Sequence, residues 1–97
     1  MEVIFSHTAT ETLQYIVTSV AHKWNRKVSD KFIEKVYKVI DSIAHQPYLF
    51  PSIAYLEGVR KAVITKQTSV IYKIHDNHIE VLYFWDNREK PLSIDQH

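Results

Sequence analysis

The chain has 97 residues, with 12 Lys and Arg against 11 Asp and Glu, one glycine and no cysteine. This length suits a single domain, 1–97, and the absence of cysteine excludes disulfides and thiolate metal sites. A near-neutral charge is untypical of dedicated nucleic-acid binders, and one glycine argues against the glycine-rich loops of nucleotide-dependent enzymes.

The N-terminal sequence carries no sign of secretion or membrane insertion. Met1 leads directly into the strand-like run Glu2-Val3-Ile4-Phe5, without a basic segment or a long apolar stretch. We therefore expect a cytoplasmic protein without membrane contact. The histidines do not show metal-ligand spacing, so we expect neither a metal nor another cofactor.

Residues 2–6 are predicted to form a short strand, and the first helix is predicted at 9–25. The T-x-x-E spacing of Thr8 and Glu11 is typical of a capping box at a helix start. Apolar residues then recur at helical spacing. They are Leu13, Ile16, Val17, Val20 and Trp24.

A second helix is predicted from Ser29, after a short connection at 26–28. Ser29 can cap the first turn, and Asp30 suits the positive end of the helix dipole. Pro47 ends this helix, because proline disfavours helical geometry at the preceding residue. The predicted buried stripe comprises Phe32, Val36, Val39, Ile40 and Ile43.

Three strands are predicted in the second half of the chain. Residues 46–58 form a loop held to the core by apolar side chains, and β-branched runs follow at 59–65, 70–74 and 79–85. Asp76-Asn77 suits a tight turn. Strands joined by such short turns are antiparallel.

The order β-α-α-β-β-β predicts an α+β domain, with two antiparallel helices packed on one face of an antiparallel sheet. A chain of this size lacks a second layer, so we expect the other sheet face to be open, with exposed apolar side chains. That face and the helix stripe form a candidate docking surface. A partner could add a strand at a free edge or lay a helix in the groove.

Several segments occur in an order and spacing that resemble a known family. They are Val3-Ile4-Phe5-Ser6, Phe50-Pro51, Val59-Arg60-Lys61, Val70-Ile71-Tyr72-Lys73-Ile74 and the run from Trp85 to Pro91. Together they resemble the RelE/ParE superfamily of toxins from type II toxin–antitoxin systems. The resemblance implies a compact toxin that is neutralised by an antitoxin wrapped around it. The toxin would form a homodimer or a toxin–antitoxin hetero-oligomer. Some members cut messenger RNA on the ribosome, and others poison DNA gyrase.

The resemblance implies different sites for these two activities. Ribonucleases of the RelE type place lysines on alternate residues of the second strand, facing the open side. They add an arginine before the third-strand Val-Tyr pair, another after the fourth strand, and a tyrosine in the tail. The corresponding positions here hold Arg60 and Ala62, Ser69 and Arg88, and no tyrosine follows Tyr83. Because each lost charge-stabilising group costs about two to three orders of magnitude in rate, RelE-type cleavage is disfavoured.

Two alternatives to RelE-type cleavage stay open. A related nuclease branch uses His and Glu as acid and base, and His75, His78, Glu80 and Glu89 lie near the sheet ends. The ParE-like branch often ends its sheet in an Asp-x-Arg-x-x-Pro stretch, as residues 86–91 do here. We therefore expect a gyrase-binding toxin. A ribosome-dependent endoribonuclease and an inactivated toxin kept as a partner-binding module are the alternatives.

The candidate contact residues lie on the strands and at the sheet ends. The predicted target- or partner-binding set is Arg60, Lys61, Tyr72, Lys73, Tyr83, Trp85 and Arg88. If the chain is a nuclease, the catalytic candidates are Arg60, Arg88, His75 and His78. The three aromatic residues could stack on bases, although strand aromatics more often pack in a core.

Cations also gather around the tip of the predicted helix pair. They are His22, Lys23, Arg26, Lys27, Lys31 and Lys35. Contact with nucleic acid is one interpretation, but such a run usually forms a solvated face.

Overall fold

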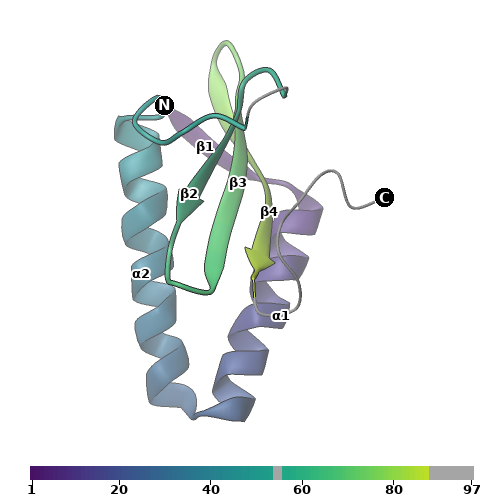
Figure 1. Cartoon of the computed structure of the whole chain (residues 1–97), viewed down its shortest axis with the longest axis vertical. Helices are drawn as coiled ribbons and strands as arrows, with labels where there is room; N and C mark the ends of the chain where they lie inside the picture. The colour runs from purple at the N-terminus through teal and green to yellow at the C-terminus, as the bar shows by residue number, and fades with distance from the viewer. Residues whose placement is uncertain (54–55, 88–97) are drawn as a thin grey trace.

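The computed structural model describes residues 1–53 and 56–87, which form two helices and a four-stranded sheet (Figure 1). The elements are β1 (Glu2–Phe5), α1 (His7–Lys23), α2 (Arg26–His45), β2 (Val59–Val63), β3 (Thr68–Ile74) and β4 (His78–Asp86). The predicted element order and the α+β class are confirmed. Arg88, Glu89 and Pro91 lie outside the described residues. Within the described part, neither helix is long and apolar enough to cross a membrane.

The sheet is mixed, which corrects the prediction of an antiparallel one. Its order is β1-β4-β3-β2, and β1 runs parallel to β4, while the other two pairs are antiparallel. β2, β3 and β4 are joined by short turns and pair antiparallel, as predicted. β1 can pair in parallel, because two helices and two strands separate it from β4 along the chain.

Both helices begin earlier than predicted, because other residues cap them. The Ser6 hydroxyl accepts from the Ala9 N–H at 3.0 Å, and Asn25 Oδ1 accepts from the Val28 N–H at 2.9 Å. Ser6 also donates to the carbonyl of Leu82 at 2.8 Å, so its cap ties the start of α1 to β4. The predicted caps, Thr8 and Ser29, therefore lie inside the helices.

The core lies between the helices and one face of the sheet. Ile16 of α1, Val36 and Ile43 of α2, and Val70 and Val81 of the sheet are all almost fully buried. Because these positions recur at helical or alternating spacing, the predicted stripes are largely confirmed.

Trp24 is the exception in the predicted stripe of α1, since its side chain is 62% exposed. The helix ends at Lys23, and the helix pair extends beyond the β2–β3 turn at the lower end of Figure 1. The sheet therefore does not reach far enough to cover the indole.

The reverse face of the sheet, turned away from the helices, is not the open apolar surface that was predicted. Strand alternation and register place Val59, Lys61 and Val63 there, together with their β3 partners. Val59 and Ile71 are buried on this face, whereas Val63 is 60% exposed. Its remaining side chains are mostly polar or aromatic.

The outer edge of β2 is also partly occupied. The Ile53 N–H donates to the Val59 carbonyl at 2.9 Å, and the Lys61 N–H donates to the Pro51 carbonyl at 3.1 Å. A partner strand therefore cannot pair along the whole of this edge, as the docking prediction allowed.

Candidate functional site

Two neighbouring cations of β2 point to opposite sides of the sheet. Arg60 pairs in register with Tyr72 of the helix-facing side, and Lys61 pairs with Ile71 of the reverse face. Arg60 Nη1 donates to the Phe50 carbonyl at 2.5 Å and to the Tyr48 carbonyl at 3.3 Å. The guanidinium also lies 5.1 Å from the centre of the Tyr48 ring. Arg60 therefore holds the loop that follows α2, and it does not face the reverse side as the ribonuclease pattern implied.

Tyr72 completes this loop anchor. Its hydroxyl donates to the Pro47 carbonyl at 2.6 Å, and its ring meets Phe50 edge to face at 6.5 Å. Burial raises the pKa of Tyr72 to about 12, although the Arg60 guanidinium offsets part of that rise. The side chain is 0% exposed. The burial agrees with the core-packing interpretation of Tyr72 and corrects its place in the predicted target- or partner-binding set.

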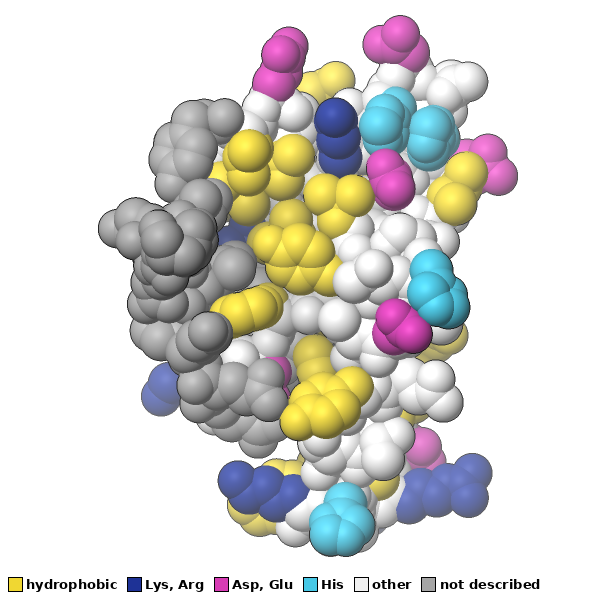
Figure 2. Space-filling view, turned by 90° about the vertical axis from the view of Figure 1, so that its right-hand side faces the viewer, with side chains coloured by type: hydrophobic (Ala, Val, Ile, Leu, Met, Phe, Trp, Pro, Cys, Tyr) yellow, Lys and Arg dark blue, Asp and Glu magenta, His cyan; other side chains and the backbone are white. Residues whose placement is uncertain are grey.

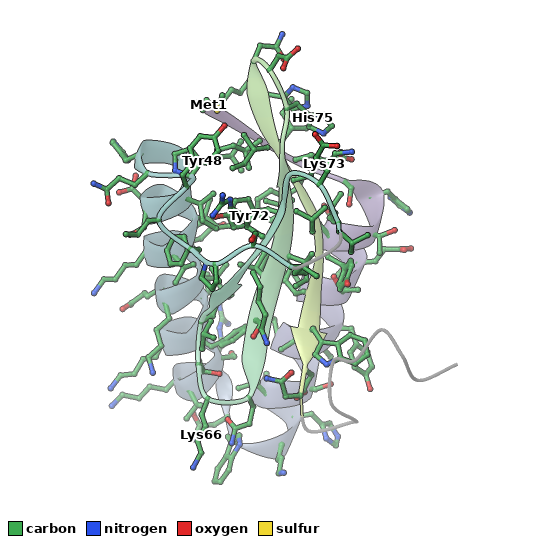
Figure 3. The ribbon with its side chains drawn as sticks, turned by 45° about the horizontal axis from the view of Figure 1, so that its top comes forward. Met1, Tyr48, Lys66, Tyr72, Lys73 and His75 are labelled. Atoms are coloured by element: carbon green, nitrogen blue, oxygen red, sulfur yellow. The ribbon has the colours of Figure 1, made fainter. Side chains whose placement is uncertain are left out.

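Four titratable side chains lie together on the reverse face, around the turn that joins β3 to β4: Lys73, His75, His78 and Glu80. His75 Nε2 lies 3.0 Å from Glu80 Oε1, and both side chains are about one-third exposed. The rings of His75 and His78 stack with centroids 4.5 Å apart, and His78 Nδ1 lies 2.9 Å from the Asn77 side-chain oxygen. Lys73 is directly opposite Glu80 in the register. Figure 3 shows Lys73 and His75 near this end of β3 and Lys66 at the other.

A hollow of about 610 Å³ lies beside this cluster. It is lined by Glu57, Gly58, Lys73, Ile74, His75, Asp76, Asn77 and His78. Gly58 has φ +76°, and a Cβ there would lie 3.3 Å from the Ile74 carbonyl oxygen. Only glycine fits this conformation without strain. Sequence reasoning missed Glu57 and Gly58 as site residues, although a sole glycine directly before a strand was an available signal.

A β-bulge brings the two aromatic residues of β4 to the reverse face. Tyr72 pairs with Val81 and Ile71 pairs with Tyr83, so Leu82 is the extra residue. In a regular strand, Glu80 and Tyr83 would point to opposite sides. The bulge instead places Tyr83 and Trp85 on the same face as Glu80, half-buried, and burial raises the pKa of the Tyr83 hydroxyl.

Several positions that correspond to ribonuclease cations lack a cation on the reverse face. Ala62 is buried on the helix-facing side, and Ser69 is buried, with no hydrogen-bond partner for its hydroxyl among residues 1–53 and 56–87. Arg88 lies outside the described residues. Across 1–53 and 56–87, no three His, Asp or Glu side chains lie close enough to hold a metal ion.

The reverse face therefore combines two lysines, an imidazole–carboxylate pair and two aromatic rings. Lys61 and Lys73 can contact phosphate or carboxylate groups. The His75–Glu80 pair can accept and pass a proton. Tyr83 and Trp85 offer apolar contact area beside these polar groups. This arrangement suits recognition of a macromolecule better than enclosure of a small substrate.

Comparison with known structures shows the same fold in bacterial toxins. The chromosomal ParDE toxin–antitoxin system of P. aeruginosa matches with a TM-score of 0.75 at 12% identity, over 89% of this chain and 95% of that one. The YoeB dimer of Staphylococcus aureus matches with a TM-score of 0.62 at 20% identity, over 88% and 94%. The E. coli DinJ–YafQ complex matches with a TM-score of 0.63 at 12% identity, over 91% and 94%.

Comparison of the sequence gives the family. No curated protein matches it significantly. The family described as the ParE toxin of the type II toxin–antitoxin system parDE matches residues 3–91, which is nearly the whole chain. The chain therefore belongs to the ParE toxin family of the RelE/ParE superfamily.

Proposed function

We propose that this toxin acts by binding and inhibiting DNA gyrase, and that an antitoxin neutralises it. The family match and the arrangement of β2 support this proposal. Arg60, the cation that a ribonuclease would direct at RNA, is bonded to loop carbonyls on the helix-facing side. The reverse face, with Lys61 and Lys73, is the surface proposed to contact gyrase.

The bonding of Arg60 to loop carbonyls is the main observation against RelE-type cleavage. A cation that stabilises a pentavalent phosphorane must be free to approach it within hydrogen-bond distance. Arg60 would first have to release two carbonyls and the Tyr48 ring. Binding to gyrase needs no such set, because it requires only complementary contacts.

The test uses the purified full-length chain in two parallel assays. In the first, gyrase supercoils relaxed plasmid; we expect the toxin to block supercoiling and to trap cleaved DNA. In the second, a coupled translation reaction contains the same toxin concentration; we expect the messenger RNA to stay intact. The toxin bound to its antitoxin is the control. Undisturbed gyrase together with codon-specific mRNA cuts would refute the proposal.

Ribosome-dependent RNA cleavage is the second candidate function, and the His75–Glu80–His78 cluster favours it. The two imidazoles have different surroundings, because His75 contacts the Glu80 carboxylate and His78 contacts the Asn77 amide. One imidazole could therefore act as base and the other as acid. If this candidate is correct, His75→Gln should lower mRNA cleavage by about 10²- to 10⁴-fold. His22→Gln, which changes a histidine outside the cluster, is the control.

We also propose that the partner is a small antitoxin encoded by the gene next to the gene of this chain. The similar solved structures include the toxin–antitoxin complexes DinJ–YafQ and YoeB–YefM. Co-purification of the neighbouring gene product with this chain tests the pairing. The same experiment, followed by mass measurement of the complex, decides between a homodimer and a hetero-oligomer.

A further inference from the structure

A second hollow lies at the tip of the helix pair, at the opposite end of β3 from the reverse-face cluster. It has a volume of about 330 Å³ and opens between the end of α1, the start of α2 and the β2–β3 turn. Its lining consists of Val20, Trp24, Val28, Lys31, Phe32, Lys35, Thr65, Gln67 and Thr68. We call it the helix-tip pocket.

The helix-tip pocket exposes apolar surface that the fold does not cover. Trp24 is 62% exposed and Val28 is 39% exposed. The backbone N–H of Trp24 donates to the Val20 carbonyl at 2.9 Å, which fixes the main chain at this position. An uncovered tryptophan beside an apolar hollow is typical of interaction hot spots. Ligand pockets span about 300–1,000 Å³, so this one suits one or two large side chains.

The rim of the helix-tip pocket is positively charged. Lys27, Lys31 and Lys35 follow one another at i, i+4 and i+8 and therefore form one row along α2. Two of them line the pocket, whereas Asp30 and Glu34 do not. Figure 2 shows Lys and Arg side chains gathered at this lower end and most of the visible acidic side chains higher up. Although the formal net charge of the chain is only +1, positive charge is concentrated at the helix-tip end of the molecule.

We propose that the helix-tip pocket binds an acidic amphipathic segment of the antitoxin. An apolar side chain of that segment would occupy the hollow beside Trp24, and its carboxylates would face Lys31 and Lys35. The proposal rests on the proposed function for the identity of the partner. The chemistry of the partner follows from the apolar lining and the cationic rim.

The lining favours a peptide over nucleic acid as the occupant. Single-stranded nucleic acids bind on successive aromatic rings that stack with successive bases. The helix-tip pocket offers one exposed ring, Trp24, and its other apolar walls are the aliphatic Val20 and Val28 with the buried Phe32. Aliphatic walls suit the apolar face of an amphipathic helix.

Calorimetric titration of the purified antitoxin into the full-length toxin tests the proposal. We expect Trp24→Ala to weaken binding at least about thirtyfold, as for a hot-spot tryptophan. Lys35→Glu should weaken binding about tenfold at low salt and less at high salt, because salt screens the attraction. The matched control is Lys38→Glu, on the same helix with the same change in charge, because Lys38 does not line the pocket. We expect Lys38→Glu to change affinity less than about twofold.

Tryptophan fluorescence gives an independent readout. In a Trp85→Phe chain, Trp24 is the sole tryptophan. Its emission should shift to shorter wavelength when the antitoxin covers it. Circular dichroism confirms that each variant is folded before it is compared.

Three outcomes would overturn the proposal: equal effects of Lys35→Glu and Lys38→Glu, an unshifted Trp24 emission, or tight binding of a 20-nucleotide RNA that depends on Lys35.

Growth assays distinguish failure of the helix-tip proposal from failure of the proposed function. Lys35→Glu should arrest growth like the natural chain but need more antitoxin for rescue. A chain that binds antitoxin through Trp24 yet leaves gyrase active would refute only the gyrase proposal.

Discussion

The two faces of the sheet use the same kinds of residue in opposite ways. On the helix-facing side, Arg60 and Tyr72 have their polar atoms bonded to loop carbonyls. On the reverse face, Lys61 and Lys73 are half-buried at positions from which a partner can be reached. The role of a cation on a strand therefore cannot be assigned until the face of the sheet to which it points is known. One residue of register separates a structural arginine from a lysine available for recognition.

The largest effect expected from this comparison is the loss of core packing on the helix-facing side. Ile43 is 0% exposed, so Ile43→Ala should lower the free energy of unfolding by about 3 kcal/mol. Val63→Ala, at a position 60% exposed on the reverse face, should change it by less than about 0.5 kcal/mol. Urea unfolding followed by circular dichroism measures both. Similar losses for the two variants would contradict the assignment of the core.

The next effect concerns the two cations of β2. Arg60→Met should lower the free energy of unfolding by about 2 kcal/mol, because it leaves carbonyls of the loop without their charged donor. Lys61→Met should leave stability within about 0.5 kcal/mol and should instead reduce gyrase inhibition. Both variants are compared at equal concentrations of folded protein. If Arg60→Met abolishes inhibition while remaining fully stable, Arg60 is a contact residue after all.

A smaller effect is expected from the Tyr72 hydroxyl. At pH 7, Tyr72→Phe should lower the free energy of unfolding by about 1 kcal/mol through loss of the bond to Pro47. Since the pKa of Tyr72 is raised from 10.0 to about 12, the natural chain should lose stability as pH rises through this range. The phenylalanine variant lacks that loss, so the two stability curves should converge above pH 10. Parallel curves would show that burial does not shift this group.

The smallest change in stability is expected at the His75–Glu80 pair. Glu80→Gln should alter the free energy of unfolding by no more than about 1 kcal/mol, because both partners are partly exposed to solvent. If the reverse face binds gyrase, inhibition should fall more in Lys73→Ala than in Glu80→Gln. A Glu80→Gln chain that loses mRNA cleavage would favour the nuclease alternative instead.

Part of the candidate site could be predicted from the sequence. The alternation along β2 predicts that Arg60 and Lys61 face opposite sides, but it does not say which side meets the helices, because each side carries one cation and two apolar residues. Analogy with ribonucleases assigned Arg60 to the reverse face. The buried Ala62 shows which side faces the helices, and Arg60 lies on that side because the carbonyls of the loop after α2 accept from its guanidinium.

Other features of the site depend on contacts that no local pattern contains. The bulge at Leu82 moves Tyr83 and Trp85 to the face of Glu80, and strand periodicity alone predicts the reverse. The choice of Ser6 over Thr8 as the cap of α1 depends on the Leu82 carbonyl. Both outcomes reflect the meeting of the first and last elements of the chain.

The element order, the apolar stripes of both helices and the three hairpin strands follow from the sequence alone, because each depends on spacing among near neighbours. The parallel pairing of β1 with β4, the bonding of Arg60 to the loop after α2 and the exposure of Trp24 follow only from the folded arrangement. These features depend on which distant segments meet and on where the sheet ends. Local periodicity carries no information about either.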